Sequence, residues 1–362
     1  MQATAGGDAI AYAGDHSKNP TRRLPVSATT PLPSAPASLP SYLEPMAPGV
    51  YGIDTAFQRD HFDAAFLIVD GGRAAFIDTG TRLALPRLLG ALEALGVPRE
   101  AVDWVIPTHV HLDHAGGVGP LMAALPSATL LVHPRGLRHM VDPSALWAGA
   151  LAVYGEAEMR RSYGELVGVP ESRAQASRDE QRITVGARPL RLIDTPGHAR
   201  HHHCVWDETS GGWFTGDTFG LSYREFDDPD RGAWIMPTST PVQFEPDALR
   251  ASIARMMTTR PSRMYLTHYG VVGRDAADVE RLAALLVEQI DEMAAIALRL
   301  KDAPDRHVAL KRELLALYQR RAIAHCGERM PPTRVAALLA MDVELNAQGL
   351  GVWLDKTNSS AP

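Results

Sequence analysis

Short apolar runs alternate with polar turns in the first part of the chain. Residues 50–55, 64–70 and 73–80 contain the β-branched and aromatic side chains that are typical of strands. Two glycines separate the last two runs, so the pattern predicts a hairpin there. Leucines then recur at helical spacing and stop before Gly96, at Leu85, Leu88, Leu89, Leu92 and Leu95. The pattern therefore predicts strands that lead into a covering helix.

The same alternation continues to about residue 270. The next predicted segments are, in order, a strand (102–109), a helix (115–125), a strand (128–133), a helical insert (about 144–166), two strand pairs (182–198 and 203–217) and a last strand (262–270). Strands alternate with helices in the first half and come as hairpins in the second. This mixture predicts an α/β protein in which mixed sheets lie between helices, with αβ/βα layering.

The chain becomes purely helical after Gly273. A long apolar stripe at helical spacing is formed by Val279, Leu282, Leu286, Ile290, Met293, Ala297 and Leu300. Shorter amphipathic helices are expected at about 306–324 and 333–348, the last ending at Gly349. Packing on the preceding region is the favoured interpretation, with a cap over an active site or a dimer surface as the alternatives. We therefore divide the chain into a catalytic domain (49–273) and a helical extension (274–362).

The region before Gly49 differs in composition. Residues 19–45 contain seven prolines among Ser, Ala and Thr, which favours a flexible leader over residues 1–48. The first residues lack the pattern of a secretory signal, and no stretch reaches the roughly 20 apolar residues of a membrane span. The default expectation is a cytoplasmic protein.

Net charge and residue usage reduce the number of possible functions. The 36 basic and 42 acidic residues give a net charge of −6, so no basic field draws the protein to nucleic acid or to an anionic membrane. Fourteen histidines stand against two cysteines, Cys204 and Cys326. Thiolate-rich zinc sites are therefore excluded, whereas a metal site of imidazoles and carboxylates is open.

The densest group of potential metal ligands follows the predicted strand at 102–106. Three imidazoles and a carboxylate stand within six positions, at His109, His111, Asp113 and His114. An extended backbone points the first two side chains the same way, and the last two lie on the turn into a helix. One metal is thus offered two imidazoles, and a neighbouring metal is offered a carboxylate and an imidazole.

Three more polar residues follow apolar strands further along the chain. They are His198 in a Pro-Gly-His turn, Asp217 in a Gly-Asp pair and His268 after Tyr265-Leu266-Thr267. Because each one ends a strand, they could converge at one sheet edge with the first group. His202 either supports this site or packs in its strand.

This order of motifs, H-x-H-x-D-H, a Pro-Gly-His turn, a Gly-Asp pair and a late strand-end His, resembles the metallo-β-lactamase fold hydrolase superfamily. The resemblance spans about residues 49–273 and implies a four-layer αβ/βα sandwich that holds two divalent metal ions. It assigns ligands as follows: His109, His111 and His198 to the first metal, Asp113, His114 and His268 to the second, and Asp217 to both as a bridge. It also implies a supporting role for Asp78. Zinc suits these ligands, and iron or manganese remains open.

The resemblance also narrows the activity. True β-lactamases generally lack the bridging carboxylate supplied here by Asp217, and di-iron relatives commonly carry Glu where this chain has His111. With these two classes set aside, the chain resembles the glyoxalase II-like thioesterases, lactonases, esterases and phosphotriesterases of the superfamily. We therefore expect a metal-bridging hydroxide to attack an ester-like bond, namely a thioester, lactone, carboxylester or phosphotriester, in a small apolar substrate, since metal binding lowers the pKa of water from about 15.7 toward 7.

Two residues are candidates for direct roles in catalysis. Asp113 could orient the nucleophile and pass a proton to the leaving group. Tyr223 lies in the loop from Phe219 to Phe244, whose aromatic side chains we interpret as a pocket wall. Tyr223 is a candidate hydrogen-bond donor to the substrate oxygen, similar to a tyrosine that lactonase members use after their Gly-Asp motif.

Two alternative functions have different partners. One is a signalling or effector protein of the same fold whose C-terminal helices bind a partner protein; the intact ligand set weighs against it. The other is a phosphodiesterase that acts on nucleic acid, and the chain shows no basic, aromatic-interleaved stretch in its favour. We expect a small-molecule substrate, neither nucleic acid nor membrane as partner, and leave a homodimer open.

Overall fold

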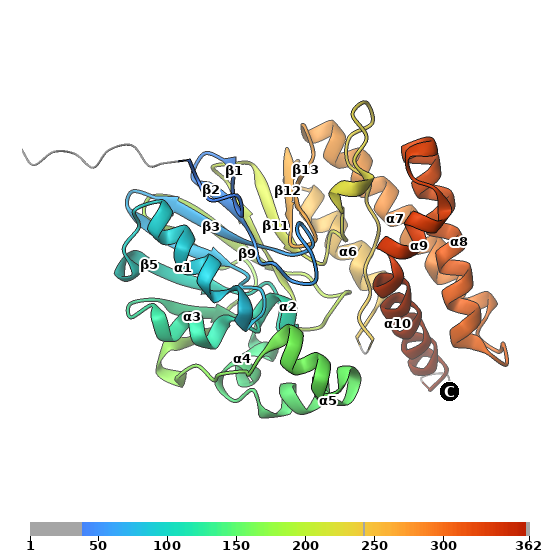
Figure 1. Ribbon diagram of the computed structural model, residues 1–362, viewed down its shortest axis with the longest axis horizontal. Helices are drawn as coiled ribbons and strands as arrows, with labels where there is room; N and C mark the ends of the chain where they lie inside the picture. Colours follow the sequence, from blue (N-terminus) through green and yellow to red (C-terminus); the bar gives the residue numbers. More distant parts are fainter. Residues whose placement is uncertain (1–37, 242, 360–362) are drawn as a thin grey trace, which may run out of the picture. The chain divides into compact units, whose positions relative to one another are not determined.

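Two mixed β-sheets form the centre of the fold in the computed structural model, which describes residues 38–241 and 243–359 (Figure 1). The first sheet follows the order β1-β2-β3-β4-β5-β6-β7. Its strands are β1 (Leu43–Ala47), β2 (Val50–Asp54), β3 (Ala64–Asp70), β4 (Arg73–Ile77), β5 (Val102–Ile106), β6 (Thr129–Val132) and β7 (Ala174–Ala176). Neighbours pair antiparallel from β1 to β4 and parallel from β4 to β7. The predicted hairpin is confirmed between β3 and β4.

The second sheet follows the order β13-β12-β11-β10-β9-β8. Its strands are β8 (Arg182–Val185), β9 (Arg188–Asp194), β10 (His203–Asp207), β11 (Gly212–Gly216), β12 (Arg263–Leu266) and β13 (Gly270–Val272). All neighbours pair antiparallel except β11 and β12, which are parallel. Both sheets are therefore mixed, as the sequence pattern predicted.

The two sheets pack face to face through their apolar side chains. Phe66 of β3 contacts Phe214 of β11 with a ring-centroid distance of 5.2 Å, and Phe214 stacks on Tyr265 of β12 at 4.5 Å. These rings belong to one buried cluster to which both sheets contribute. Since successive strand side chains point to opposite faces, the other faces of both sheets are left for helices.

Helices cover both outer faces. On the first sheet lie α1 (Leu85–Ala94), α3 (Val118–Ala124) and α4 (Pro134–Val141), which share a buried cluster with that sheet. On the second lie α6 (Pro246–Met257) and α7 (Ala276–Arg299), in a cluster with Trp213 and Met264. The four-layer αβ/βα sandwich is thus confirmed, and the insert forms α5 (Ser144–Glu158) at its edge (Figure 1).

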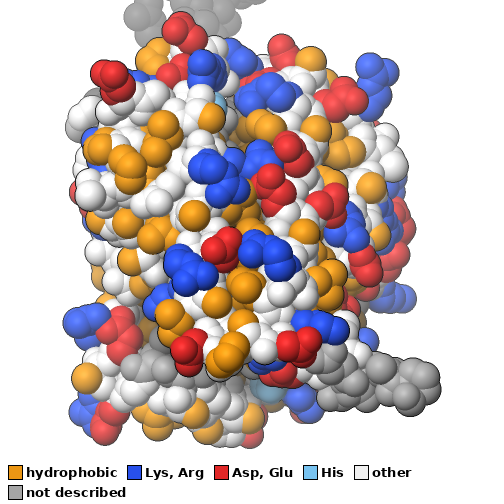
Figure 2. Space-filling view, turned by 90° about the vertical axis from the view of Figure 1, so that its right-hand side faces the viewer, with side chains coloured by type: hydrophobic (Ala, Val, Ile, Leu, Met, Phe, Trp, Pro, Cys, Tyr) orange, Lys and Arg blue, Asp and Glu red, His pale blue; other side chains and the backbone are white. Residues whose placement is uncertain are grey.

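The C-terminal helices pack on α7. They are α8 (Arg306–Cys326), α9 (Pro332–Leu338) and α10 (Ala340–Ser359), and their buried side chains join the cluster of α6 and α7. On the face of the molecule shown in Figure 2, the exposed hydrophobic side chains are interspersed with Lys, Arg, Asp and Glu. The buried cluster that these helices share with α6 and α7 confirms that they pack on the preceding region.

The boundaries differ from prediction in two places. The sheet begins with β1 at Leu43, before the expected domain start at Gly49, because Leu43 is buried against the first sheet. Helix α10 does not end at Gly349 but continues to Ser359. A Cβ at Gly349 would collide with the side chain of Ser239 and the carbonyl of Thr240, so this glycine lets the helix approach a loop rather than end there.

Residues 1–37 of the predicted flexible leader lie outside the described residues. Among the described residues, no single helix has the length and apolar composition to cross a membrane; one pair bent by 68°, Pro332–Leu338 with Ala340–Thr357, passes that test jointly.

Candidate metal centre

The predicted ligand residues all lie at one edge of the two sheets. His109 and His111 follow β5, and Asp113 and His114 lie on the short helix α2 (Leu112–Ala115) that comes next. His198, Asp217 and His268 follow β9, β11 and β12. Residues up to 159 positions apart in the sequence therefore meet because their strands end side by side.

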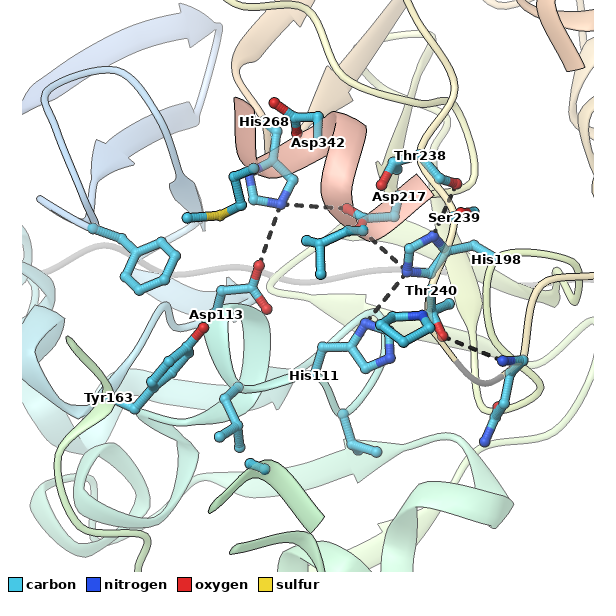
Figure 3. Close-up of a pocket in the computed structure, with 18 of the residues that line it drawn as sticks. His111, Asp113, Tyr163, His198, Asp217, Thr238, Ser239, Thr240, His268 and Asp342 are labelled. Atoms are coloured by element: carbon cyan, nitrogen blue, oxygen red, sulfur yellow. Dashed lines mark hydrogen bonds and ion pairs between the residues drawn. The ribbon is translucent and has the colours of Figure 1, made fainter. Parts of the chain in front are cut away.

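These seven side chains form two groups that could each hold a metal ion. In the first, His109, His111, His198 and Asp217, one ligand atom from each residue lies within 4.8 Å of the others; Asp113, His114 and His268 form the second group by the same measure. The carboxylate of Asp217 lies between them, with Oδ2 3.2 Å from His198 Nε2 and Oδ1 3.3 Å from His114 Nε2. Figure 3 shows five of the seven side chains pointing toward this common centre.

Unsatisfied polar atoms show that the centre fits a cation. His114 Nε2 and Asp217 Oδ1 are buried and face each other at 3.3 Å, and neither has a well-formed hydrogen bond to any of the described residues. In addition, His109 Nε2 and His111 Nδ1 approach to 2.7 Å, so two ring nitrogens share one proton at most between them. An unsatisfied buried polar atom costs about 1–3 kcal/mol, and imidazole and carboxylate donors suit zinc and related divalent ions.

Asp78 fixes the orientation of His114 from outside the centre. Its Oδ2 accepts hydrogen bonds from His114 Nδ1 at 2.9 Å and from the Thr267 hydroxyl at 2.8 Å. Its Oδ1 accepts the backbone N–H of Thr108 at 2.6 Å. Because Nδ1 is engaged, Nε2 of His114 is the nitrogen that faces the centre. This agrees with the supporting role that the family resemblance implied.

Backbone carbonyls orient two further histidines in the same way. His268 Nδ1 donates to the carbonyl of Phe62 at 3.0 Å, and His198 Nδ1 donates to that of Thr238 at 3.2 Å. Both therefore direct Nε2 toward the carboxylates. In the second group, His268 Nε2 lies 3.4 Å from Asp113 Oδ2.

The electrostatics differ between the two groups. Burial and the neighbouring imidazoles hold the pKa of His109 and of His111 well below the usual value, so both rings are neutral. Burial also acts to lower the pKa of His268, but Asp217 and Asp113 outweigh it and raise that pKa to about 10. The pKa of His114 is likewise raised, against burial, by Asp217, Asp113 and Asp78. Without metal, protons in the second group therefore balance the buried carboxylates.

The run His201-His202-His203 lies next to the centre but differs in its hydrogen bonding. His202 has both ring nitrogens engaged: Nδ1 pairs with the Thr195 hydroxyl at 2.9 Å, and Nε2 accepts the backbone N–H of Asp217 at 3.2 Å. Of the two interpretations of His202, the structure favours support of the site. Cys204 is fully buried in the core, as expected for a small apolar side chain.

A cavity of about 360 Å³ opens onto the centre. Its walls include the apolar residues Ala145, Leu146 and Ala150 of α5, the loop around Ser239, and residues of α10. The sequence did not point to several of its lining residues, namely Phe57, Phe62, Tyr163, Met341 and Asp342. None of them lies in a recognisable motif, and a position in a helix or loop does not by itself indicate that a side chain lines a cavity.

Tyr223 lines this cavity, but the other aromatic residues of its loop do not. Phe219, Phe226 and Trp234 are buried in the core formed with α7 and the C-terminal helices. The loop itself does form a wall of the cavity, as predicted, through Leu221, Tyr223 and residues 238–241. The prediction was wrong only for these three aromatic side chains, because apolar side chains in a loop can belong to either a core or a cavity. The hydroxyl of Tyr223 donates to Asp342 Oδ1 at 3.1 Å.

Comparisons with known proteins agree with this geometry. A family model described as the metallo-beta-lactamase superfamily matches residues 60–268. A hydroxyacylglutathione hydrolase from Cupriavidus taiwanensis is 36% identical over 172 residues, 46% of this chain and 52% of that protein. An atrochrysone carboxyl ACP thioesterase from Aspergillus fumigatus is 30% identical over 154 residues, 42% of this chain and 38% of that protein.

An archaeal relative is similar in sequence and in structure. This metallo-beta-lactamase fold-containing protein from Sulfurisphaera tokodaii is 26% identical over 182 residues, 48% of this chain and 62% of that protein. A solved structure of an archaeal superfamily protein from Sulfolobus tokodaii superposes with a TM-score of 0.56 at 19% identity, covering 83% of this chain and 98% of that one. At that identity the likeness shows the fold alone. In sequence, the matches span about half the length of the curated relatives.

Proposed function

The chain belongs to the metallo-beta-lactamase superfamily, and we propose that it is a hydrolase that uses two divalent metal ions, zinc foremost, to cleave an ester-like bond in a small substrate. Among thioesters, lactones, carboxylesters and phosphotriesters, we favour thioesters. Two relatives carry the names hydroxyacylglutathione hydrolase and ACP thioesterase, which supports this order.

The position of Asp217 carries the proposal. A carboxylate with one oxygen 3.2 Å from a histidine of the first group and the other 3.3 Å from a histidine of the second suits a bridge between two cations. A single structural metal would need only one of the two groups. The site also lies at the floor of a cavity whose volume suits a small molecule.

The chain's own residues would hold the ions and prepare the substrate. When bound, such ions lower the pKa of water and polarise the substrate carbonyl. The histidines and Asp217 would hold the ions at the strand ends. Asp78 keeps His114 in the tautomer whose Nε2 can bind a metal ion. Asp113, whose side chain is 25% exposed and faces the cavity, is placed to accept a proton and pass it to the leaving group.

The apolar cavity wall favours a substrate with an aliphatic or aromatic part. Helix α5 contributes small and branched apolar residues to it, while polar groups gather around the metal centre. A net charge of −6 gives no support for a nucleic-acid substrate. A cytoplasmic location and a homodimeric state stay predictions from the sequence.

Metal analysis together with a substrate panel tests the proposal. We expect about two metals per chain and hydrolysis of at least one thioester, lactone, carboxylester or phosphotriester. His111→Ala should abolish this activity, whereas the control His307→Ala, which changes a half-exposed histidine on α8, should leave it intact. A fully metallated chain that is inert toward all four classes would overturn the proposal.

A further inference from the structure

A carboxylate from the C-terminal helix reaches the cavity beside the metal centre. Of the three carboxylates that line the cavity, Asp113 and Asp217 belong to the metal groups, and the third is Asp342 of α10. Figure 3 shows Asp342 next to His268. Its side chain is more than nine-tenths buried, and its Oδ2 has no hydrogen-bond partner among the described residues.

Asp342 determines where the proton of Tyr223 lies. The hydroxyl of Tyr223 donates to Asp342 Oδ1 at 3.1 Å, and a phenol has only one proton to donate. Burial and the neighbouring Asp342 raise the pKa of Tyr223 well above its usual value, so the hydroxyl keeps this proton.

The ring of Tyr223 packs against two side chains that also contact each other. Phe62 stacks on it with ring centroids 5.1 Å apart, and the guanidinium carbon of Arg59 lies 4.5 Å from the Tyr223 centroid and 4.6 Å from that of Phe62. The Tyr223 side chain is 1% exposed. This packing holds the phenol oxygen in place beside Asp342.

We propose that Asp342 makes Tyr223 a hydrogen-bond acceptor in the substrate cavity, so that the site selects substrates with a hydrogen-bond donor, such as a hydroxyl or amide N–H, near the bond that is cleaved. This inference rests on the proposed hydrolase function, and it reverses the role in catalysis that the sequence suggested for Tyr223. With its proton engaged, the phenol offers only oxygen lone pairs to a ligand. Asp342 is accordingly a positioning residue, and Tyr223 contacts the substrate.

Binding of product-like acids tests the inference without turnover. We would measure the Kd of hexanoate and of 2-, 3- and 4-hydroxyhexanoate for the metal-loaded chain by calorimetry. At least one hydroxy acid should bind roughly tenfold more tightly than hexanoate, the gain of one additional hydrogen bond. Tyr223→Phe should remove this advantage, and Asp342→Ala, which frees the phenol proton, should reduce it, whereas the control His307→Ala should bind all four acids as the wild type does. Asp342→Asn, which keeps an amide oxygen as acceptor, should preserve it.

An advantage that survives Tyr223→Phe would come from the metals and overturn the inference, as would equal binding of all four acids to the wild type. Turnover separates the two proposals. With hexanoyl and hydroxyhexanoyl thioesters, Tyr223→Phe should lower the ratio of kcat/KM for the hydroxy substrate to kcat/KM for the plain one, whereas the control His307→Ala should leave both values unchanged. A 100-fold loss of kcat on both would mean that Tyr223 donates to the reacting oxygen instead. A wild type inert toward both thioesters and toward the other ester classes would refute the hydrolase function, while the calorimetric result would still decide the role of Tyr223.

Discussion

Two sets of buried histidines lie side by side in this protein and differ in what their ring nitrogens contact. In the run at 201–203, His203 pairs with the Ser177 hydroxyl at 2.9 Å through Nδ1 and donates from Nε2 to the Pro107 carbonyl at 3.0 Å. In the metal centre, His114 has one nitrogen on Asp78 and the other without a hydrogen-bond partner. His203 thus hydrogen-bonds only to a neutral hydroxyl and a carbonyl, whereas His114 lies against the carboxylates of Asp78 and Asp217.

The difference matters because both sets belong to histidine-rich stretches of the sequence. His203, whose two nitrogens are paired and which does not line the cavity at the metal centre, is expected to contribute to stability. A buried ring with one free nitrogen is costly unless a cation completes it, so it belongs to a site. Substitutions in the two sets should therefore lower different quantities, metal content in one and stability in the other.

Asp217→Ala should have the largest effect. It removes the carboxylate that lies between both groups, so we expect hydrolysis to fall by more than about 1,000-fold and the metal content to fall below two per chain. Mass spectrometry for metals and turnover on the best substrate of the panel would measure both. If Asp217→Ala kept two metals and full activity, its assignment as a bridge would be wrong.

Asp78→Ala should lower metal affinity without removing a ligand. His114 would lose the hydrogen bond that fixes its tautomer, and outer partners of this kind are typically worth 10–100-fold in affinity. Competition with a chromogenic chelator would measure the change. The metal held by the second group should be the one affected, because His114 belongs to that group only; an equal loss at both would contradict that division.

Much of the site could be predicted because its residues follow strands. Strand-end positions such as His109, His198 and His268 are visible as polar residues after apolar runs, and strand ends in one sheet meet at one edge. The strands themselves could be predicted because they are apolar runs bounded by polar and turn residues. Edge strands such as β7 and β13, of three residues each, were too short to show a pattern.

The cavity wall could not be predicted in the same way. Asp342 comes from a helix 119 residues beyond Tyr223, and nothing near it in the sequence indicates that α10 approaches the metal centre. The aromatic residues of the loop at 219–244 gave the opposite error, since Phe219 is apolar and near Asp217 yet belongs to the core. Which apolar side chains face a cavity depends on packing between distant elements.

His203→Ala should leave the metals in place and destabilise the fold. It leaves the Ser177 hydroxyl and the Pro107 carbonyl buried without their partner, which we expect to lower the free energy of unfolding by roughly 3 kcal/mol. Urea unfolding of metal-loaded protein, with metal content measured on the same sample, tests this. A loss of metal with unchanged stability would contradict the division of the histidines into two sets.

The smallest expected effect is a dependence of stability on pH in the metal-free chain. The carboxylates around His268 raise its pKa to about 10, against burial, from about 6.5 in an unfolded chain. A pKa raised in this way stabilises the fold fully below pH 6.5, and the contribution is lost as the pH rises toward 10. Histidines with a lowered pKa, such as His203, change stability only at lower pH.

From pH 7 to 8 the free energy of unfolding should therefore fall, by at most about 1.4 kcal/mol for His268. Urea unfolding at both pH values measures the change. Metal-loaded protein should lack the dependence, because a metal ion then takes the place of the proton on Nε2; if both forms showed it equally, His268 would not be a ligand.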